Sequence, residues 1–125
     1  MSTILIIDDE EDFNLMMKTA LELKGYEVET ACNGREAKAL YQNKQYDAIV
    51  TDIIMPDVDG YEVILDLRRM GLSDRTIAVS AGGRTSADDY LVTAKHFGVA
   101  ATFNKPIDLQ QFRDKIEEII KSHQQ

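Results

Sequence analysis

The hydrophobic and polar positions of the chain follow two alternating periods. Short runs of β-branched and other apolar residues are typical of buried strands. They alternate with stretches in which apolar residues recur every three or four positions, as in amphipathic helices. This pair of patterns occurs five times along the chain. The predicted strands are Ile4–Ile7, Tyr26–Ala31, Asp47–Thr51, Thr76–Ser80 and Ala100–Asn104.

A predicted helix follows each predicted strand. The first helix extends from Asp12 to Lys24, and the last from about Leu109 to Ser122. Asn33 and Glu36 have the spacing of a capping box at the start of the second helix. The apolar residues expected to face inward are Phe13, Met16, Met17 and Ala20; Ala37, Leu40 and Tyr41; Val63, Ile64, Leu67 and Met70; Tyr90, Ala94 and Phe97; and Phe112, Ile116, Ile119 and Ile120.

Strict alternation of strand and helix predicts an α/β fold with a parallel sheet and helices on both faces. The 125 residues suffice for a single hydrophobic core, and no linker or low-complexity tract divides them. The 44% hydrophobic and 29% charged content is typical of a soluble globular protein. We therefore expect residues 1–125 to form one domain without an output domain.

Charge and composition exclude several classes of protein. The formal net charge of −8 argues against nucleic-acid binding, which needs a clustered basic face. No apolar run approaches the roughly 18 residues of a membrane-spanning helix. The N-terminal apolar run ends at two aspartates and so predicts a strand, not a signal peptide. Cys32 is the only cysteine, which excludes an intrachain disulfide and favours a cytoplasmic location.

Reactive side chains gather at the ends of the predicted strands. Asp8 and Asp9 follow the first strand, Asp52 the third, Ser80 ends the fourth and Lys105 follows the fifth. Because the carboxyl ends of parallel strands lie at one edge of a sheet, we expect these groups to converge. Carboxylate oxygens suit Mg²⁺. The central aspartate could act as a covalent nucleophile that forms an acyl phosphate, with the ammonium and hydroxyl groups binding phosphoryl oxygens.

Four ordered motifs carry a resemblance to a known family. Ile4–Glu10 is similar to the opening strand and acidic pair of response-regulator receiver domains, and Thr51–Gly60 resembles their phosphorylation loop. Val79–Ala81 resembles the switch-hydroxyl motif, and Asn104–Pro106 the lysine-proline motif. The chain as a whole looks like a single-domain, CheY-like receiver of two-component signalling.

The resemblance implies a flavodoxin-like strand order of 2-1-3-4-5. It implies that a sensor histidine kinase or a histidine phosphotransfer protein phosphorylates Asp52. Asp9, Asp52 and the backbone carbonyl of Ile54 would bind Mg²⁺ directly, and Asp8 would help through water. Such a protein is a signalling partner of other proteins and not a metabolic enzyme. Its cognate kinase and its downstream target are not predicted by the sequence.

The resemblance also assigns the remaining site residues. Lys105 would hold the phosphoryl group, and Ser80 would move toward it. The Lys105–Pro106 peptide bond is commonly cis in this family. The fourth helix, fifth strand and fifth helix would form the surface that passes on the signal.

Two features depart from the family pattern. Thr102 stands where well-studied members have an aromatic residue or histidine, so a swinging ring cannot couple the switch hydroxyl to the partner surface. Ile54 and Gly82 flank the path of a hydrolytic water in the family. An apolar Ile54 cannot orient that water, and we therefore hypothesise slow autodephosphorylation.

The first predicted helix also contains an apolar residue outside its inward stripe. Leu15, beside Asn14 and Lys18, is expected to face solvent. Because this helix lies next to the predicted phosphorylation site, we hypothesise that Leu15 contacts the kinase partner.

Three alternatives stay open to the sequence. A Mg²⁺-dependent phosphohydrolase could use the same aspartate and metal, but the chain has no insertion that could form a substrate-enclosing cap. A binding module with a vestigial site would not need the intact set of reactive residues. The third alternative is a receiver domain excised from a larger hybrid kinase or regulator.

Overall fold

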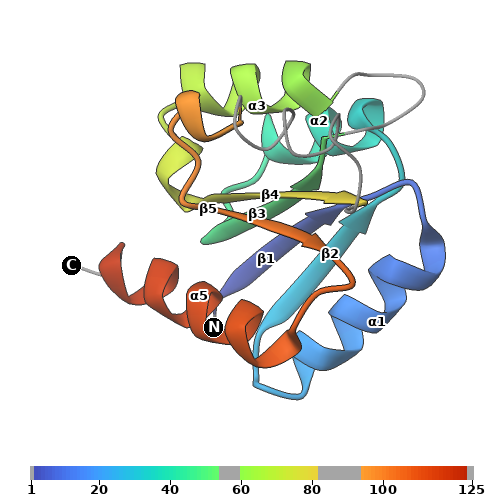
Figure 1. The fold of residues 1–125 in the computed structure, drawn as a ribbon. Helices are drawn as coiled ribbons and strands as arrows, with labels where there is room; N and C mark the ends of the chain where they lie inside the picture. The colour runs from blue at the N-terminus through green and yellow to red at the C-terminus, as the bar shows by residue number, and fades with distance from the viewer. Residues whose placement is uncertain (1, 54–59, 82–93, 124–125) are drawn as a thin grey trace.

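In a computed structural model, the chain forms a five-stranded sheet between two layers of helices (Figure 1). The structure describes residues 2–53, 60–81 and 94–123. The sheet order is β2-β1-β3-β4-β5, and every pair of neighbouring strands is parallel. The predicted fold class and strand order are therefore confirmed. The strands are β1 (Thr3–Ile7), β2 (Glu27–Ala31), β3 (Ala48–Asp52), β4 (Thr76–Ala81) and β5 (Ala101–Lys105).

The helices lie on both faces of the sheet, as the alternating pattern predicted. Figure 1 shows α1 and α5 on one face and α2 and α3 on the other. A short 3-10 helix, η1, precedes β4. Within the described residues, no helix is long and apolar enough to cross a membrane. The bounds are α1 (Glu11–Glu22), α2 (Gly34–Tyr41), α3 (Gly60–Arg69), η1 (Ser73–Arg75) and α5 (Leu109–Ser122).

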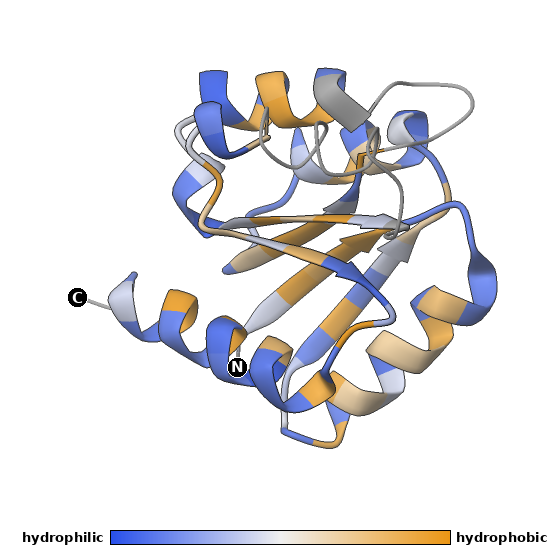
Figure 2. Ribbon diagram, in the orientation of Figure 1, coloured by the Kyte–Doolittle hydropathy of each residue, from blue (hydrophilic) through white to orange (hydrophobic). Residues whose placement is uncertain are grey.

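Alternating side chains of the strands supply the two halves of the core. In β1, Ile4 and Ile6 pack with residues of α1 and α5, whereas Leu5 and Ile7 pack with residues of α2 and α3. This division follows from the twofold period of a strand. Figure 2 shows the apolar character of β1 and β3 at the centre of the sheet. Burial on both faces leaves only the ends of these strands for polar chemistry.

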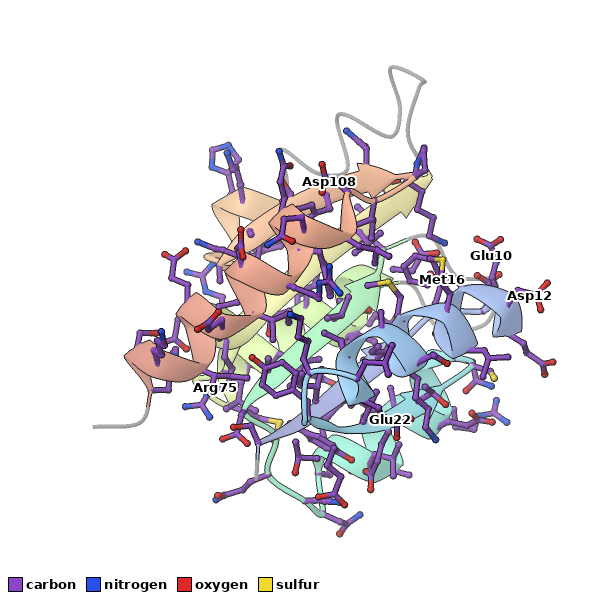
Figure 3. The ribbon with its side chains drawn as sticks, turned by 90° about the horizontal axis from the view of Figure 1, so that it is seen from below. Glu10, Asp12, Met16, Glu22, Arg75 and Asp108 are labelled. Atoms are coloured by element: carbon purple, nitrogen blue, oxygen red, sulfur yellow. The ribbon has the colours of Figure 1, made fainter. Side chains whose placement is uncertain are left out.

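The inward residues of α5 agree with the prediction, but two methionines elsewhere do not. Met16, labelled on α1 in Figure 3, is 45% exposed, as is Met70. Met70 falls one residue beyond the end of α3, in the turn to Gly71, whose φ of +77° favours glycine. The prediction that both methionines face the core is wrong.

The buried face of α1 is offset from the predicted one. It contains Met17, Leu21 and, in place of a hydrophobic residue, Asn14, which is 4% exposed. The prediction that Asn14 faces solvent is wrong, because its side chain binds the ends of two strands. Leu15 is 64% exposed, as expected. In the predicted fourth helix Ala94 is buried and Phe97 partly buried, whereas Tyr90 lies outside the described residues.

Candidate functional site

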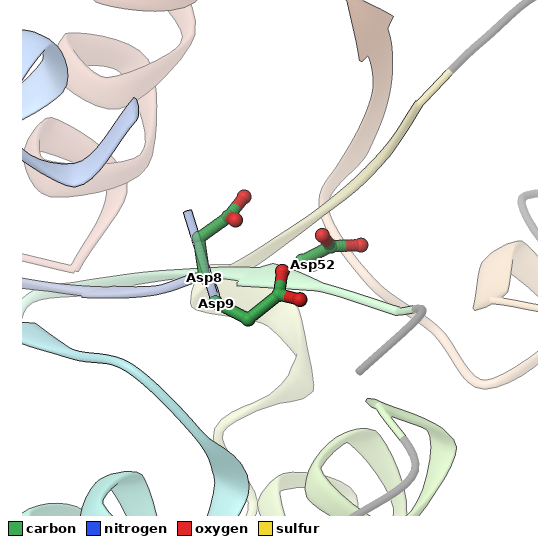
Figure 4. Close-up of side chains that lie close together, drawn as sticks. All are labelled: Asp8, Asp9 and Asp52. Carbon is green, nitrogen blue, oxygen red and sulfur yellow. The ribbon is translucent and has the colours of Figure 1, made fainter. Parts of the chain in front are cut away.

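Three aspartates meet at the carboxyl edge of the sheet. Asp8 and Asp9 follow β1, and Asp52 is the last residue of the neighbouring strand β3. One carboxylate oxygen from each lies within 4.8 Å of the other two (Figure 4). Asp8 and Asp52 are buried, whereas Asp9 is exposed. Parallel pairing of β1 with β3 thus brings together the carboxylates that the sequence predicted to converge.

Lys105 brings an ammonium group to the same edge. It is the last residue of β5, and the Lys105–Pro106 peptide bond is cis, as is common in the family that the sequence resembles. Its Nζ lies 2.7 Å from Asp8 Oδ2 and 3.7 Å from Asp52 Oδ2. The expected convergence of Lys105 with the aspartates is therefore present in the structure.

Burial and charge oppose each other in this group. Burial raises the pKa of Asp8 above its ordinary value, although Lys105 and the backbone N–H of Glu10 partly offset the effect. For Lys105 burial alone would lower the pKa, but the carboxylates of Asp8, Glu10 and Asp52 outweigh burial and raise it. The lysine therefore stays protonated and compensates part of the carboxylate charge.

Ser80 contributes a buried hydroxyl on β4. The strand register places Asp52 beside Val79, so Ser80 is one residue from the position opposite the aspartate. The Ser80 side chain is fully buried, and its Oγ has no hydrogen-bond partner among the described residues. A buried hydroxyl without a partner is costly, and it suits a group that binds an oxygen from outside the protein.

The structure adds two residues near the site that sequence reasoning missed. The Glu10 carboxylate lies 2.6 Å from Lys105 Nζ. The amide nitrogen Nδ2 of Asn14 donates hydrogen bonds to the backbone oxygens of Asp8 and Ala31. Glu10 could have been predicted, because it is the third consecutive acidic residue after β1. No pattern in the sequence marks a polar residue on α1 as buried.

Of the other predicted site residues, the structure describes Thr102 and Leu15. Thr102 lies in β5 beside Ala78 of β4 and is partly buried. Leu15 lies on the exposed side of α1 and lines a groove of about 310 Å³ with Asn14 and Cys32. Ile54, the predicted carbonyl ligand, and Gly82 lie outside the described residues.

The donor set determines what this site can bind. Carboxylate oxygens are the ligands that Mg²⁺ prefers. Three of them lie within 4.8 Å of one another, close enough to bind the same ion. An ammonium and a buried hydroxyl beside them can bind oxygens of an anion that the metal also contacts. The described residues therefore fit a divalent cation together with a phosphoryl group.

Sequence comparisons relate the chain to a known family. The profile of the response regulator receiver domain matches residues 4–117. A probable transcriptional regulator, ycf27, of Cyanidium caldarium is 34% identical over 94% of this chain and 46% of its own length. A response regulator receiver protein of Anaeromyxobacter sp. (strain Fw109-5) is 35% identical over 91% of this chain and 47% of its own length. The chain spans about half the length of these relatives.

Solved structures share the fold over nearly the whole chain. The response regulator TrrA of Thermotoga maritima, in complex with Mg²⁺-BeF, has a TM-score of 0.83 and 27% identity over 95% of this chain and 99% of its own. A two-component response regulator of Clostridium difficile has a TM-score of 0.87 and 25% identity over 100% of both chains.

Proposed function

This chain belongs to the response regulator receiver domain family of two-component signalling, and on that premise we propose that it accepts a phosphoryl group on Asp52 with Mg²⁺ bound. The observation that carries the proposal is the position of Asp52. It lies at the carboxyl end of β3, with oxygens of Asp8 and Asp9 within 4.8 Å and Lys105 Nζ 3.7 Å away. Receiver domains are signalling proteins and not metabolic enzymes.

The proposed donor is the phosphohistidine of a sensor histidine kinase or a histidine phosphotransfer protein. An Asp52 carboxylate oxygen uses a lone pair to form an O–P bond while the N–P bond of the donor breaks. The electrons of that bond leave with the imidazole, which departs neutral when its other nitrogen is protonated. Asp52 is suited to this role because it ends the central strand of the sheet and is largely enclosed, with 7% of its side chain exposed.

The residues proposed to hold Mg²⁺ are Asp8, Asp9 and Asp52, with the backbone carbonyl of Ile54. When bound, the ion neutralises charge on the phosphoryl oxygens. The solved structure of TrrA in complex with Mg²⁺-BeF supports the presence of a Mg²⁺ site in this chain, because the two proteins share the fold. Lys105 Nζ, 2.7 Å from Asp8 Oδ2 and 3.7 Å from Asp52 Oδ2, offsets part of the negative charge of this cluster.

Lys105 and Ser80 are proposed to recognise the phosphoryl group. The modification adds roughly −1.5 to −2 charges beside them. The ammonium can pair with one phosphoryl oxygen, and the Ser80 hydroxyl, which has no partner among the described residues, can donate to another. These contacts differ between the two states and so shift a pre-existing equilibrium. The signal then passes to another protein by contact, through a surface that includes Thr102 on β5.

The test uses a small phosphodonor with Mg²⁺ and measures the intact mass of the protein. We expect the wild type to gain one base-labile phosphoryl group and Asp52→Asn to gain none. Asp12→Asn is the matched control, because Asp12 is an exposed aspartate in the first turn of α1 outside the cluster. The same adduct on Asp52→Asn as on the wild type would contradict the assignment.

A further inference from the structure

The two carboxylates closest to the Lys105 ammonium are those of Glu10 and Asp8, and Glu10 has no role in the proposed site. The Lys105 Nζ lies 2.6 Å from Glu10 Oε1, 2.7 Å from Asp8 Oδ2 and 3.7 Å from Asp52 Oδ2. The Glu10 side chain is 62% exposed, whereas that of Lys105 is 14% exposed. The ammonium is thus nearer to a surface glutamate than to the proposed phosphoacceptor.

Helix capping does not account for the direction of the Glu10 side chain. Glu10 is the N-cap residue of α1, as Figure 3 shows, but its carboxylate accepts no hydrogen bond from the first turn. The N-cap residues of α2 and α5, Asn33 and Asp108, both accept such bonds. A carboxylate at this position would be favoured by the helix N–H groups and dipole. Glu10 points toward Lys105 instead.

An aromatic ring supports the same position of the ammonium. The Lys105 Nζ lies 4.2 Å from the centre of the Phe13 ring, which belongs to the first turns of α1. A ring face attracts an ammonium group at this distance. The β1–α1 segment therefore holds Lys105 through Asp8, Glu10 and Phe13 together.

We propose that Glu10 is a positioning residue that competes with the phosphoryl group for Lys105 and so lowers the affinity of the Asp52 site for it. This inference rests on the proposed function of Asp52. To pair closely with a phosphoryl oxygen on Asp52, the ammonium has to approach that residue and loosen its contact with Glu10. The Glu10 charge also repels the incoming anion. Because Glu10 is exposed, water replaces the lost contact at little cost.

The test compares binding of beryllofluoride, a phosphoryl mimic, to the full chain at saturating Mg²⁺. The chain has no tryptophan, so backbone amide shifts or titration calorimetry provide the readout. We expect Glu10→Gln to bind beryllofluoride about two- to fivefold more tightly than the wild type, the range of an exposed ion pair. The difference should shrink at high salt, which screens such a pair.

Glu11→Gln is the matched control, because Glu11 is the next acidic residue, is exposed, and forms no ion pair within the described part of the chain. We expect its affinity to remain within twofold of the wild type. Equal tightening in both variants would reduce the effect to net charge and overturn the proposal. Unchanged or weaker binding by Glu10→Gln would overturn it too, since Glu10 would then be neutral or would prepare Lys105 for the anion.

Failure of the proposed function looks different from failure of this inference. If Asp52 is not the phosphoacceptor, the wild type itself binds no beryllofluoride at that residue. If only the inference is wrong, the wild type binds beryllofluoride and the two glutamine variants do not differ in the expected direction. Thermal unfolding of both variants checks that the exposed substitutions leave the fold intact.

Discussion

Asn14 donates a hydrogen bond from Nδ2 to the backbone oxygen of Asp8 at 2.9 Å. The same nitrogen lies 3.3 Å from the backbone oxygen of Ala31, so one side chain on α1 joins the ends of β1 and β2. Asp8 N–H also donates to Ala31 O. The backbone that carries the acidic pair is therefore fixed by a buried amide and by the neighbouring strand.

Replacing Asn14 by leucine should destabilise the protein and weaken metal binding together. The substitution leaves a buried backbone oxygen without its donor, at a cost of about 1–3 kcal/mol. Denaturant unfolding measures the stability, and titration of the folded protein with Mg²⁺ measures the affinity. Asn43→Leu is the control, because Asn43 also donates to a backbone oxygen but at an exposed position. An Asn14→Leu protein as stable as that control would contradict the role assigned to Asn14.

The sequence predicts the reactive edge of the sheet well for a topological reason. Parallel strands send all their carboxyl ends to one side, so residues such as Asp52 and Lys105 converge once the strands are recognised. Helix faces are less predictable, because a polar side chain can take a core position when backbone groups there need a partner. Asn14 is such a case. The buried face of α1 therefore contains Asn14 together with Met17 and Leu21, and Met16 lies outside it and is exposed.

The contacts of Glu10 show a second limit. Its sequence neighbourhood, an acidic run before a helix, is equally typical of a capping residue. What decides its contact is the position of Lys105, 95 residues further along the chain. The Glu10–Lys105 pair forms only when the whole sheet is assembled, so the residues next to Glu10 in the sequence do not predict it.

Mg²⁺ should stabilise the folded protein through the acidic cluster. At a metal concentration of about ten times Kd, binding to the folded state alone adds about 1.4 kcal/mol to the free energy of unfolding. Thermal unfolding with Mg²⁺ or with a chelator measures this gain. We expect Asp9→Asn to lose most of the gain in stability and Asp12→Asn to keep it. Of these two residues, Asp9 belongs to the acidic cluster and Asp12 does not. An equal gain in both variants would place the metal elsewhere.

His123 should make stability depend on pH near neutrality. Its Nδ1 lies 2.8 Å from the backbone oxygen of Ile119 and its Nε2 3.1 Å from Asp74. The contact with Ile119 and, to a lesser extent, that with Asp74 raise the pKa of His123 above its ordinary value, whereas burial and the charge of Arg75 oppose the shift. Both contacts need a ring N–H, and only the imidazolium has one on each nitrogen.

Because the folded pKa is raised, this stabilisation is complete below the unfolded pKa of about 6.5 and is lost as pH rises through the folded value. At acidic pH the free energy of unfolding of the wild type should exceed that of His123→Gln by up to about 1 kcal/mol. The difference is small because the His123–Asp74 pair lies near the surface. Denaturant unfolding at a series of pH values measures the difference. Asp74→Asn should reduce the pH dependence, and a difference that grows with rising pH would contradict the assignment.

The phosphorylated state should be long-lived. Ile54, two residues after the proposed phosphoacceptor, has no group that can orient a hydrolytic water. Its position lies outside the residues that the structure describes, so the expectation rests on side-chain chemistry alone. After removal of a small phosphodonor, the phosphorylated fraction, measured by intact mass, should decay over minutes or longer. We expect the decay to be more rapid in Ile54→Asn. A half-life of seconds in the wild type would contradict the hypothesis.

Leu15 should matter for a protein donor but not for a small one. Its side chain is 64% exposed on α1, the helix that follows the acidic pair in the chain, and we expect a phosphohistidine protein to contact this helix. Leu15→Asp should therefore lower kcat/KM for transfer from a histidine kinase or phosphotransfer protein at least fivefold, about 1 kcal/mol of lost contact. Transfer from a small phosphodonor should be unchanged, because it needs no helix surface. Leu23→Asp provides the matched control, since Leu23 is 80% exposed at the far end of the same helix. Equal losses in the two variants would reflect added charge, and no loss in Leu15→Asp would remove this residue from the partner surface.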